Sequence, residues 1–139
     1  MTEPSIEEMR ANVETVRRFY DALAATDLET ILAITDPGIE VVQTDVLPWG
    51  GEFHGHDGIG DFFGKLTGTI ASRVTIDEMF AAGNDVVQIG RTAGTVKATG
   101  AEFDIREVHV LTVRAGKIVR FAATIDTPGM LAALTASAR

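Results

Sequence analysis

The fold is decided by a stretch near the C-terminus, residues 103–125, which reads FDIREVHVLTVRAGKIVRFAATI. Apolar and polar residues alternate along it, so that every second side chain lies on the same face of a β-strand. Arg114-Ala115-Gly116 interrupts the alternation with residues typical of a turn. We therefore predict two strands, 103–113 and 118–125, joined by a tight turn.

The same two-residue period extends back to residue 74. Residues 74–76 and 86–96 form two further predicted strands, and turns are expected at Gly83-Asn84 and at Thr99-Gly100. Strands that follow one another through short turns predict an antiparallel meander.

The N-terminal half follows a helical period instead. Ser5 and Glu8 have the spacing of a capping box, and apolar residues then recur every three or four positions as far as Leu23. Asp27 is expected to cap a second helix, which ends at Asp36-Pro37-Gly38. The remaining expected elements, in chain order, are a brief strand at 39–43, a Pro/Gly-rich loop at 45–55, a third helix at 57–70 and a C-terminal helix at 130–138.

Helices followed by a meander predict an α+β fold, in a single domain spanning residues 1–139. The composition, 45% apolar and 23% charged, is typical of a globular protein. With 12 basic and 20 acidic residues the net charge is −8, which argues against nucleic acid and against an anionic membrane surface as partners. The absence of cysteine excludes disulfides and thiol nucleophiles. No secretory leader or long apolar run is visible, so we expect a cytoplasmic location.

Several short sequence motifs follow one another with a defined order and spacing: FYDAL at 19–23, DLE at 27–29, PWGGEFHGHDGI at 48–59, FF at 62–63, HVLTV at 109–113, GKIV at 116–119 and DT at 126–127. Together they resemble the nuclear transport factor 2-like superfamily, and within it the SnoaL-like and ketosteroid isomerase-like enzymes. The resemblance implies a strongly curved antiparallel sheet packed on the N-terminal helices, which closes a cone around an apolar pocket. It also implies a homodimer formed through the open face of the sheet.

Alignment with the ketosteroid isomerases leaves their catalytic positions unfilled. Val42 stands where their carboxylate base is expected, and Phe19 stands at their Tyr position with Tyr20 one step round the helix. Steroid isomerisation by that mechanism is therefore not expected. Asp45, in the loop, is the carboxylate that could substitute for the base.

The similarity to limonene epoxide hydrolases is partial. Their Asp–Arg–Asp arrangement falls on Asp126, Arg91 and Ala93, so the base and the arginine match and the proton donor is missing. The SnoaL-like cyclases also place their acid/base at Asp126. Because Asp126 precedes Thr127-Pro128, it also has the sequence context of a helix N-cap, where the helix dipole keeps a carboxylate ionised.

Arg91 and His109 complete the expected catalytic group. Strand parity groups Arg91 with Val87, Ile89, Ala93 and Thr95, a mostly apolar set. We therefore expect it on the covered face of the sheet, paired with Asp126 or Glu107, although an outward-facing charge is the alternative. His109 has an ordinary pKa near neutrality and could supply the proton donor that Ala93 lacks, although a structural role in the core is the alternative.

Aromatic residues are expected to line the pocket. The only tryptophan, Trp49, lies in the Pro/Gly-rich loop, where an aromatic side chain commonly contacts a ligand. The further residues expected in the pocket wall are Tyr20, Phe53 and Phe63.

The sequence predicts neither a metal nor another cofactor. His54-Gly55-His56-Asp57 contains metal-binding residue types but no third histidine nearby, and the glycine spacing matches no phosphate-binding loop. We therefore expect a cofactor-independent acid/base enzyme of the isomerase, cyclase or epoxide hydrolase type, acting on a small, largely apolar carbonyl or epoxide compound. The alternative is a non-catalytic module or accessory subunit that binds a small molecule.

Overall fold

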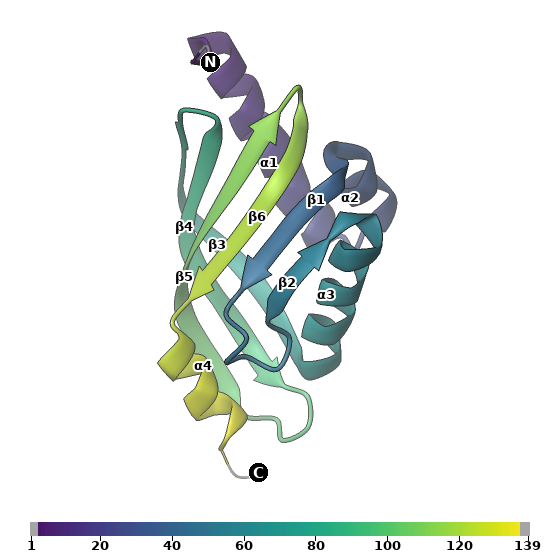
Figure 1. Ribbon diagram of the computed structural model, residues 1–139. Coiled ribbons are helices and arrows are strands. Elements are labelled where there is room, and N and C mark those ends of the chain that lie inside the picture. Colours follow the sequence, from purple (N-terminus) through teal and green to yellow (C-terminus); the bar gives the residue numbers. More distant parts are fainter. Residues whose placement is uncertain (1–2, 137–139) are drawn as a thin grey trace.

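The structure, a computed structural model, describes residues 3–136 and contains helices on one side of a mixed β-sheet (Figure 1). The elements, in chain order, are α1 (Ile6–Ala24), α2 (Leu28–Ile34), β1 (Thr35–Gln43), β2 (Gly51–His54), α3 (Gly55–Thr69), β3 (Ile70–Ala82), β4 (Asp85–Val96), β5 (Glu102–Arg114), β6 (Lys117–Ile125) and α4 (Thr127–Leu134). None of the helices formed by these residues is long and apolar enough to cross a membrane. The cytoplasmic location stays a prediction.

The predicted α+β fold is confirmed, and the sheet differs from expectation in one strand pair. The strand order is β2-β1-β6-β5-β4-β3, and every neighbouring pair is antiparallel except β1–β6, which is parallel. A parallel pair needs a long crossover connection. Helix α3 and strands β2 to β5 provide it, because they all lie between β1 and β6 in the chain.

Several element boundaries were wrong, and the strand predicted at 74–76 extends over Ile70–Ala82 as β3. Residues 51–54, expected in a loop, form β2, because they pair with β1 in the register Val41↔Phe53. Asp36-Pro37-Gly38, expected as a turn, lies inside β1 where the pairing with β6 is irregular. The C-terminal helix starts at Thr127 and ends at Leu134, whereas the last two residues of the expected helix, 137–138, lie outside the described residues.

Helix α1 starts at the predicted capping box. The Ser5 hydroxyl accepts a hydrogen bond from the Glu8 backbone N–H at 3.0 Å, and the Ser5 backbone N–H donates to the Glu8 carboxylate at 3.3 Å. The first turns of α1 project beyond the sheet (Figure 1), and Ile6 is exposed. The buried part of the helix is its C-terminal half, where Phe19 and Tyr20 face the sheet.

Alternation along the long strands defines an inner and an outer face of the sheet. On β5 every odd-numbered residue from Phe103 to Val113 is buried, and these side chains form the inner face toward the helices. The even-numbered residues, among them Arg106 and Val108, are more exposed and form the outer face.

Gly90 allows β3 and β4 to approach closely on the inner face. A Cβ atom at this position would clash with the Thr75 backbone carbonyl of β3 and would lie 2.5 Å from the Gln88 side-chain oxygen. The missing side chain therefore creates the space that the buried Gln88 amide occupies.

We predict that Gly90→Ala lowers the free energy of unfolding by about 1–3 kcal/mol, because the methyl group meets backbone atoms that cannot move aside. Gly64→Ala is the matched control, since Gly64 lies in the exposed middle of α3 and its added Cβ meets nothing within 4 Å. That change is expected to stabilise the protein by about 0.5–1 kcal/mol. Urea unfolding of both variants checks the prediction, and equal stabilities would contradict it.

Candidate functional site

A small cavity lies on the inner face of the sheet. Its volume is about 70 Å³, and its wall combines residues of α1, α3, α4, the 44–50 loop and the strands. The wall is largely apolar, and its aromatic members are Tyr20, Trp49, Phe62, Phe63 and Phe121. The ionisable side chains in the wall are Tyr20, Glu107 and His109.

These three ionisable groups meet in one buried polar cluster with Gln88. The Tyr20 hydroxyl lies 2.7 Å from Nδ1 of His109, although the two residues are 89 positions apart in the chain. The Gln88 side-chain N–H donates to the Glu107 carboxylate at 2.5 Å and lies 3.4 Å from the same Nδ1. Nε2 of His109 lies 3.6 Å from the other carboxylate oxygen of Glu107.

The contacts define the tautomer of His109. Two donors, the Tyr20 hydroxyl and the Gln88 amide, point at Nδ1, so Nδ1 is an acceptor and the ring proton lies on Nε2. Nε2–H then faces Glu107 at a distance longer than an ordinary hydrogen bond.

Burial determines the protonation of the cluster. It lowers the pKa of His109 to about 3, so the imidazole is neutral near pH 7. It raises the pKa of the Tyr20 hydroxyl, which therefore stays protonated. Burial also raises the pKa of the Glu107 carboxyl, and the hydrogen bond from Gln88 partly opposes this. Because Tyr20 and His109 stay neutral, Glu107 is the group of this cluster best suited to accept a proton.

Sequence reasoning missed the importance of Glu107 and Gln88. The sequence predicts Glu107 on the same strand face as His109 and as a possible partner of Arg91, and it assigns no role to Gln88. The signal that could have found them is strand parity, because Glu107 shares the buried face of β5 with His109. Gln88 faces them from the neighbouring strand, where it pairs directly with His109.

The expected position of Arg91 on the covered face was wrong. Arg91 lies on the outer face, where its side chain is 42% exposed and its Nε donates to the Asp104 carboxylate at 2.8 Å. The outer face of β4 is itself rich in apolar residues. The residues that share a face with Arg91 are therefore mostly apolar, although that face is not the one covered by the helices. Neither Asp126 nor Glu107 pairs with Arg91.

Asp126 has the position of a helix cap. Its carboxylate is exposed and accepts a hydrogen bond from the Gly129 backbone N–H at 3.0 Å, which caps α4. It does not line the cavity, whereas its neighbour Ile125 does. The structure therefore does not bring Asp126, Arg91 and His109 together, and the arrangement expected from the sequence does not form.

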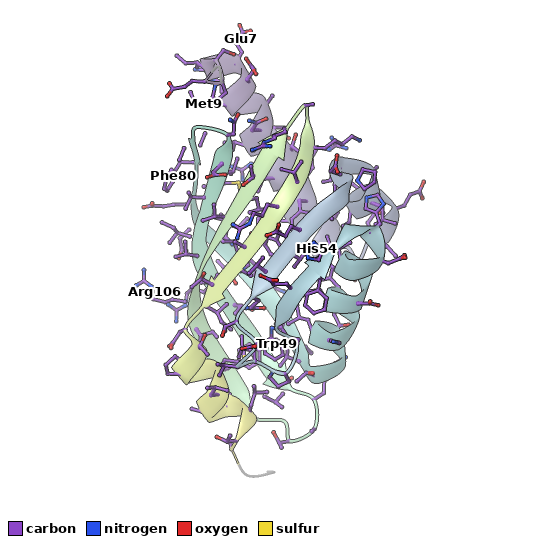
Figure 2. All side chains as sticks on the ribbon, viewed as in Figure 1. Glu7, Met9, Trp49, His54, Phe80 and Arg106 are labelled. Atoms are coloured by element: carbon purple, nitrogen blue, oxygen red, sulfur yellow. The ribbon has the colours of Figure 1, made fainter. Side chains whose placement is uncertain are left out.

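The aromatic residues divide into two groups. Trp49 lies in the cavity wall near the lower end of the molecule in Figure 2, and its indole N–H donates to Gln43 at 2.8 Å. Tyr20 and Phe63 also line the cavity. Phe53 does not, because its ring packs edge-on against Phe62 and lies beneath the Lys65 ammonium group.

The other polar candidates lie elsewhere. Asp45 is exposed and absent from the cavity wall. His54 is exposed, and Nε2 of His56 contacts the Thr35 carbonyl oxygen at 3.0 Å. Within residues 3–136 no group of three His, Cys, Asp or Glu side chains is placed to hold a metal ion.

Comparison with known proteins identifies relatives of this chain. The sequence model of the SnoaL-like domain family matches residues 16–121. No curated protein sequence matches the chain.

Among solved structures, NTF2-like proteins from Burkholderia thailandensis E264 and Burkholderia pseudomallei K96243 are 31% and 30% identical, each with a TM-score of 0.84. The alignments cover 92% and 91% of this chain and 100% and 98% of theirs, and the second relative is described as a protein of unknown function. TerC co-crystallised with polyporic acid is 25% identical, with a TM-score of 0.83 over 91% of this chain and 99% of that chain.

The cluster predicts a distinctive dependence of stability on pH. The unfolded chain protonates His109 below about pH 6.5 and the folded protein does not, so acidification destabilises the fold. The pKa of Glu107 is raised, so folded Glu107 takes up a proton above the pH at which the unfolded carboxyl does, and acidification stabilises the fold. The two effects oppose each other where their windows overlap.

We predict that Glu107→Gln removes the stabilising effect of acidification and leaves the destabilising effect of His109 unopposed. Its free energy of unfolding should fall more steeply than that of the wild type between pH 6.5 and 4.5, by up to about 1.4 kcal/mol per pH unit. Urea unfolding across this range measures the slope. Glu102→Gln, the same change at an exposed position of the same strand, should keep the wild-type slope. Identical slopes in the wild type and Glu107→Gln would contradict the assignment.

Proposed function

The chain belongs to the SnoaL-like domain family, and from this premise we propose that it is an acid–base enzyme that needs no cofactor. Its substrate is a small, largely apolar carbonyl or epoxide compound bound in the cavity. One observation carries the proposal: a buried carboxyl, Glu107, lies beside a neutral hydrogen-bond donor, His109 Nε2–H, in a largely apolar cavity.

In this proposal Glu107 removes the proton and His109 stabilises the oxygen. The carbonyl oxygen and the α-carbon of a ketone are two bonds apart, so a base and a donor that lie 3.6 Å apart can address both together. The C–H bond breaks as Glu107 accepts the proton, and the electron pair moves onto the oxygen, which accepts a hydrogen bond from Nε2–H. Where the enolate is conjugated with a carbon–carbon double bond, return of the proton to the far end of the conjugated system completes an isomerisation. A neutral imidazole is suited to this role, as it is in triosephosphate isomerase.

Tyr20 and Gln88 position the two reacting groups. Tyr20 donates to Nδ1 and so keeps the His109 proton on Nε2, next to the carboxylate. Gln88 holds the other oxygen of Glu107 in place. Trp49 and Phe63 form the apolar wall against which the body of the substrate packs.

A binding module without catalysis is the second candidate. It is favoured by the pairing within the cluster, since Tyr20, Glu107 and the Gln88 amide N–H all have partners in the protein. A relative of similar length, TerC, was crystallised with polyporic acid, which supports the binding of a small organic molecule by this fold.

Proton abstraction can be tested without knowledge of the natural substrate. The protein is incubated in D₂O with a panel of small ketones, and deuterium incorporation at the α-carbon is followed by NMR. We predict that Glu107→Gln slows the exchange about 10²–10⁴-fold, because it removes the base.

Asp126→Asn is the matched control, because it tests the carboxylate that the sequence favoured. It should keep the wild-type exchange rate and nearly the wild-type stability, because the side-chain oxygen of an asparagine caps a helix about as well as that of an aspartate. Exchange lost in Asp126→Asn and kept in Glu107→Gln would reverse the assignment. Saturable binding of ketones with no exchange would favour the binding module.

We also propose that two copies of the chain associate through the outer face of the sheet. An apolar row crosses four strands there, because Phe80, Val87, Val110 and Ala122 are paired in register. Phe80 is 44% exposed and, with Arg106, lies at the left margin of the molecule in Figure 2, on the side away from α2 and α3. Association would bury this row.

The dimer is tested by placing a charge in the row. Val110→Arg is expected to yield a monomer at micromolar concentration, measured by light scattering, whereas the wild type is a dimer. Thr67→Arg, on the exposed side of α3, is the control and should leave the dimer intact. A monomeric wild type would overturn the proposal.

A further inference from the structure

The cavity wall contains one acidic side chain and, among the described residues, no lysine or arginine to balance it. This acidic side chain is Glu107. Glu107 is only 3% exposed, so water cannot screen its charge effectively.

The partners of Glu107 are all neutral. Gln88 donates an amide N–H at 2.5 Å, and the nearest ring nitrogen, at 3.6 Å, belongs to neutral His109. Tyr20, which faces the cluster from α1, is a protonated hydroxyl. When it is ionised, Glu107 therefore has one hydrogen bond, from Gln88, and no compensating positive charge, and a cationic ligand would offset the cost of burying the charge.

The wall of the cavity is also rich in aromatic side chains. Five aromatic side chains contribute to the wall, and Phe121 stacks edge-to-face with both His109 and Phe62 at centroid distances of 5.0 and 6.2 Å. The faces of aromatic rings carry negative potential and attract ligand cations. A net charge of −8 raises the concentration of cations near the protein surface.

We infer that Glu107 makes this cavity select its ligand by charge: a small apolar ligand with a protonated amine is preferred, its uncharged isostere is accepted and a carboxylate of the same shape is rejected. The inference concerns the cavity of the proposed function and names the class of ligand that it takes. An ammonium group would donate a charge-assisted hydrogen bond to the Glu107 carboxylate and supply the positive charge that its protein partners lack. A carboxylate would place a second negative charge beside Glu107 with no cation to offset it.

Three probes of nearly the same shape test the inference: benzylammonium, benzyl alcohol and benzoate. Trp49 is the only tryptophan and lines the cavity, so its indole N–H signal in NMR titrations reports binding at this site alone. We expect benzylammonium to bind about tenfold more tightly than benzyl alcohol, and benzoate to give no saturable shift.

Glu107→Gln has nearly the same shape without the charge, and it should equalise the affinities of benzylammonium and benzyl alcohol. Glu102→Gln removes one exposed negative charge from the same strand and should preserve the wild-type order. The inference is overturned if benzoate binds as tightly as benzyl alcohol, if benzylammonium gives no saturable shift, or if the order persists in Glu107→Gln. The wild-type series alone decides the matter if Glu107→Gln does not fold.

The binding experiment separates this inference from the proposed function, because it requires no turnover. Deuterium exchange can fail while the order of affinities holds, which leaves a charge-selective binding module. Benzoate can bind well while exchange still depends on Glu107, which leaves the enzyme without charge selection.

Discussion

The hydrogen bond between Tyr20 and His109 joins the first helix to the central region of the sheet, and the other polar groups of the cavity depend on it. A buried polar group is costly without a partner, so Tyr20 and His109 each require the other. Because Tyr20 donates to Nδ1, the His109 proton lies on Nε2 and faces Glu107. Gln88 is the fourth member of this buried polar cluster. Its side chain occupies space beside Gly90 that a Cβ atom at that position would enter. A change at any of these positions alters the protonation or the placement of the others.

The apolar surroundings give this cluster its chemistry. In water a histidine titrates near neutrality and a glutamic acid well below it, but burial disfavours both charged forms and reverses this order. The carboxyl group then becomes the one suited to accept a proton, while the imidazole is a neutral hydrogen-bond donor. Burial raises the pKa of Glu107, and the wall of the cavity contributes no lysine or arginine among the described residues, so the cavity is unfavourable for anions. Reactivity and ligand selection therefore have one physical origin.

The two faces of the sheet have separate roles. The inner face holds the cavity and packs against the helices, whereas the outer face carries the Arg91–Asp104 ion pair and the apolar row that contains Phe80. Both faces of β4 are rich in apolar residues, which is expected if both become covered. Substitutions on different sides of the same strands can consequently test the proposed catalysis and ligand binding separately from the proposed association.

The sequence by itself determined the local structure, because caps and strand alternation depend on near neighbours. Ser5 with Glu8, Asp27 and Asp126 each cap a helix as predicted, and the alternation of 103–125 forms two paired strands. It also placed Glu107 and His109 on one face. Only the tertiary structure decided which face of β4 turns inward. As a result Arg91 lies outside the cavity, and Gln88 is buried beside Glu107 and His109. Periodicity shows which side chains share a face, but the inward face is chosen by the packing of helices and strands that lie far apart in the chain.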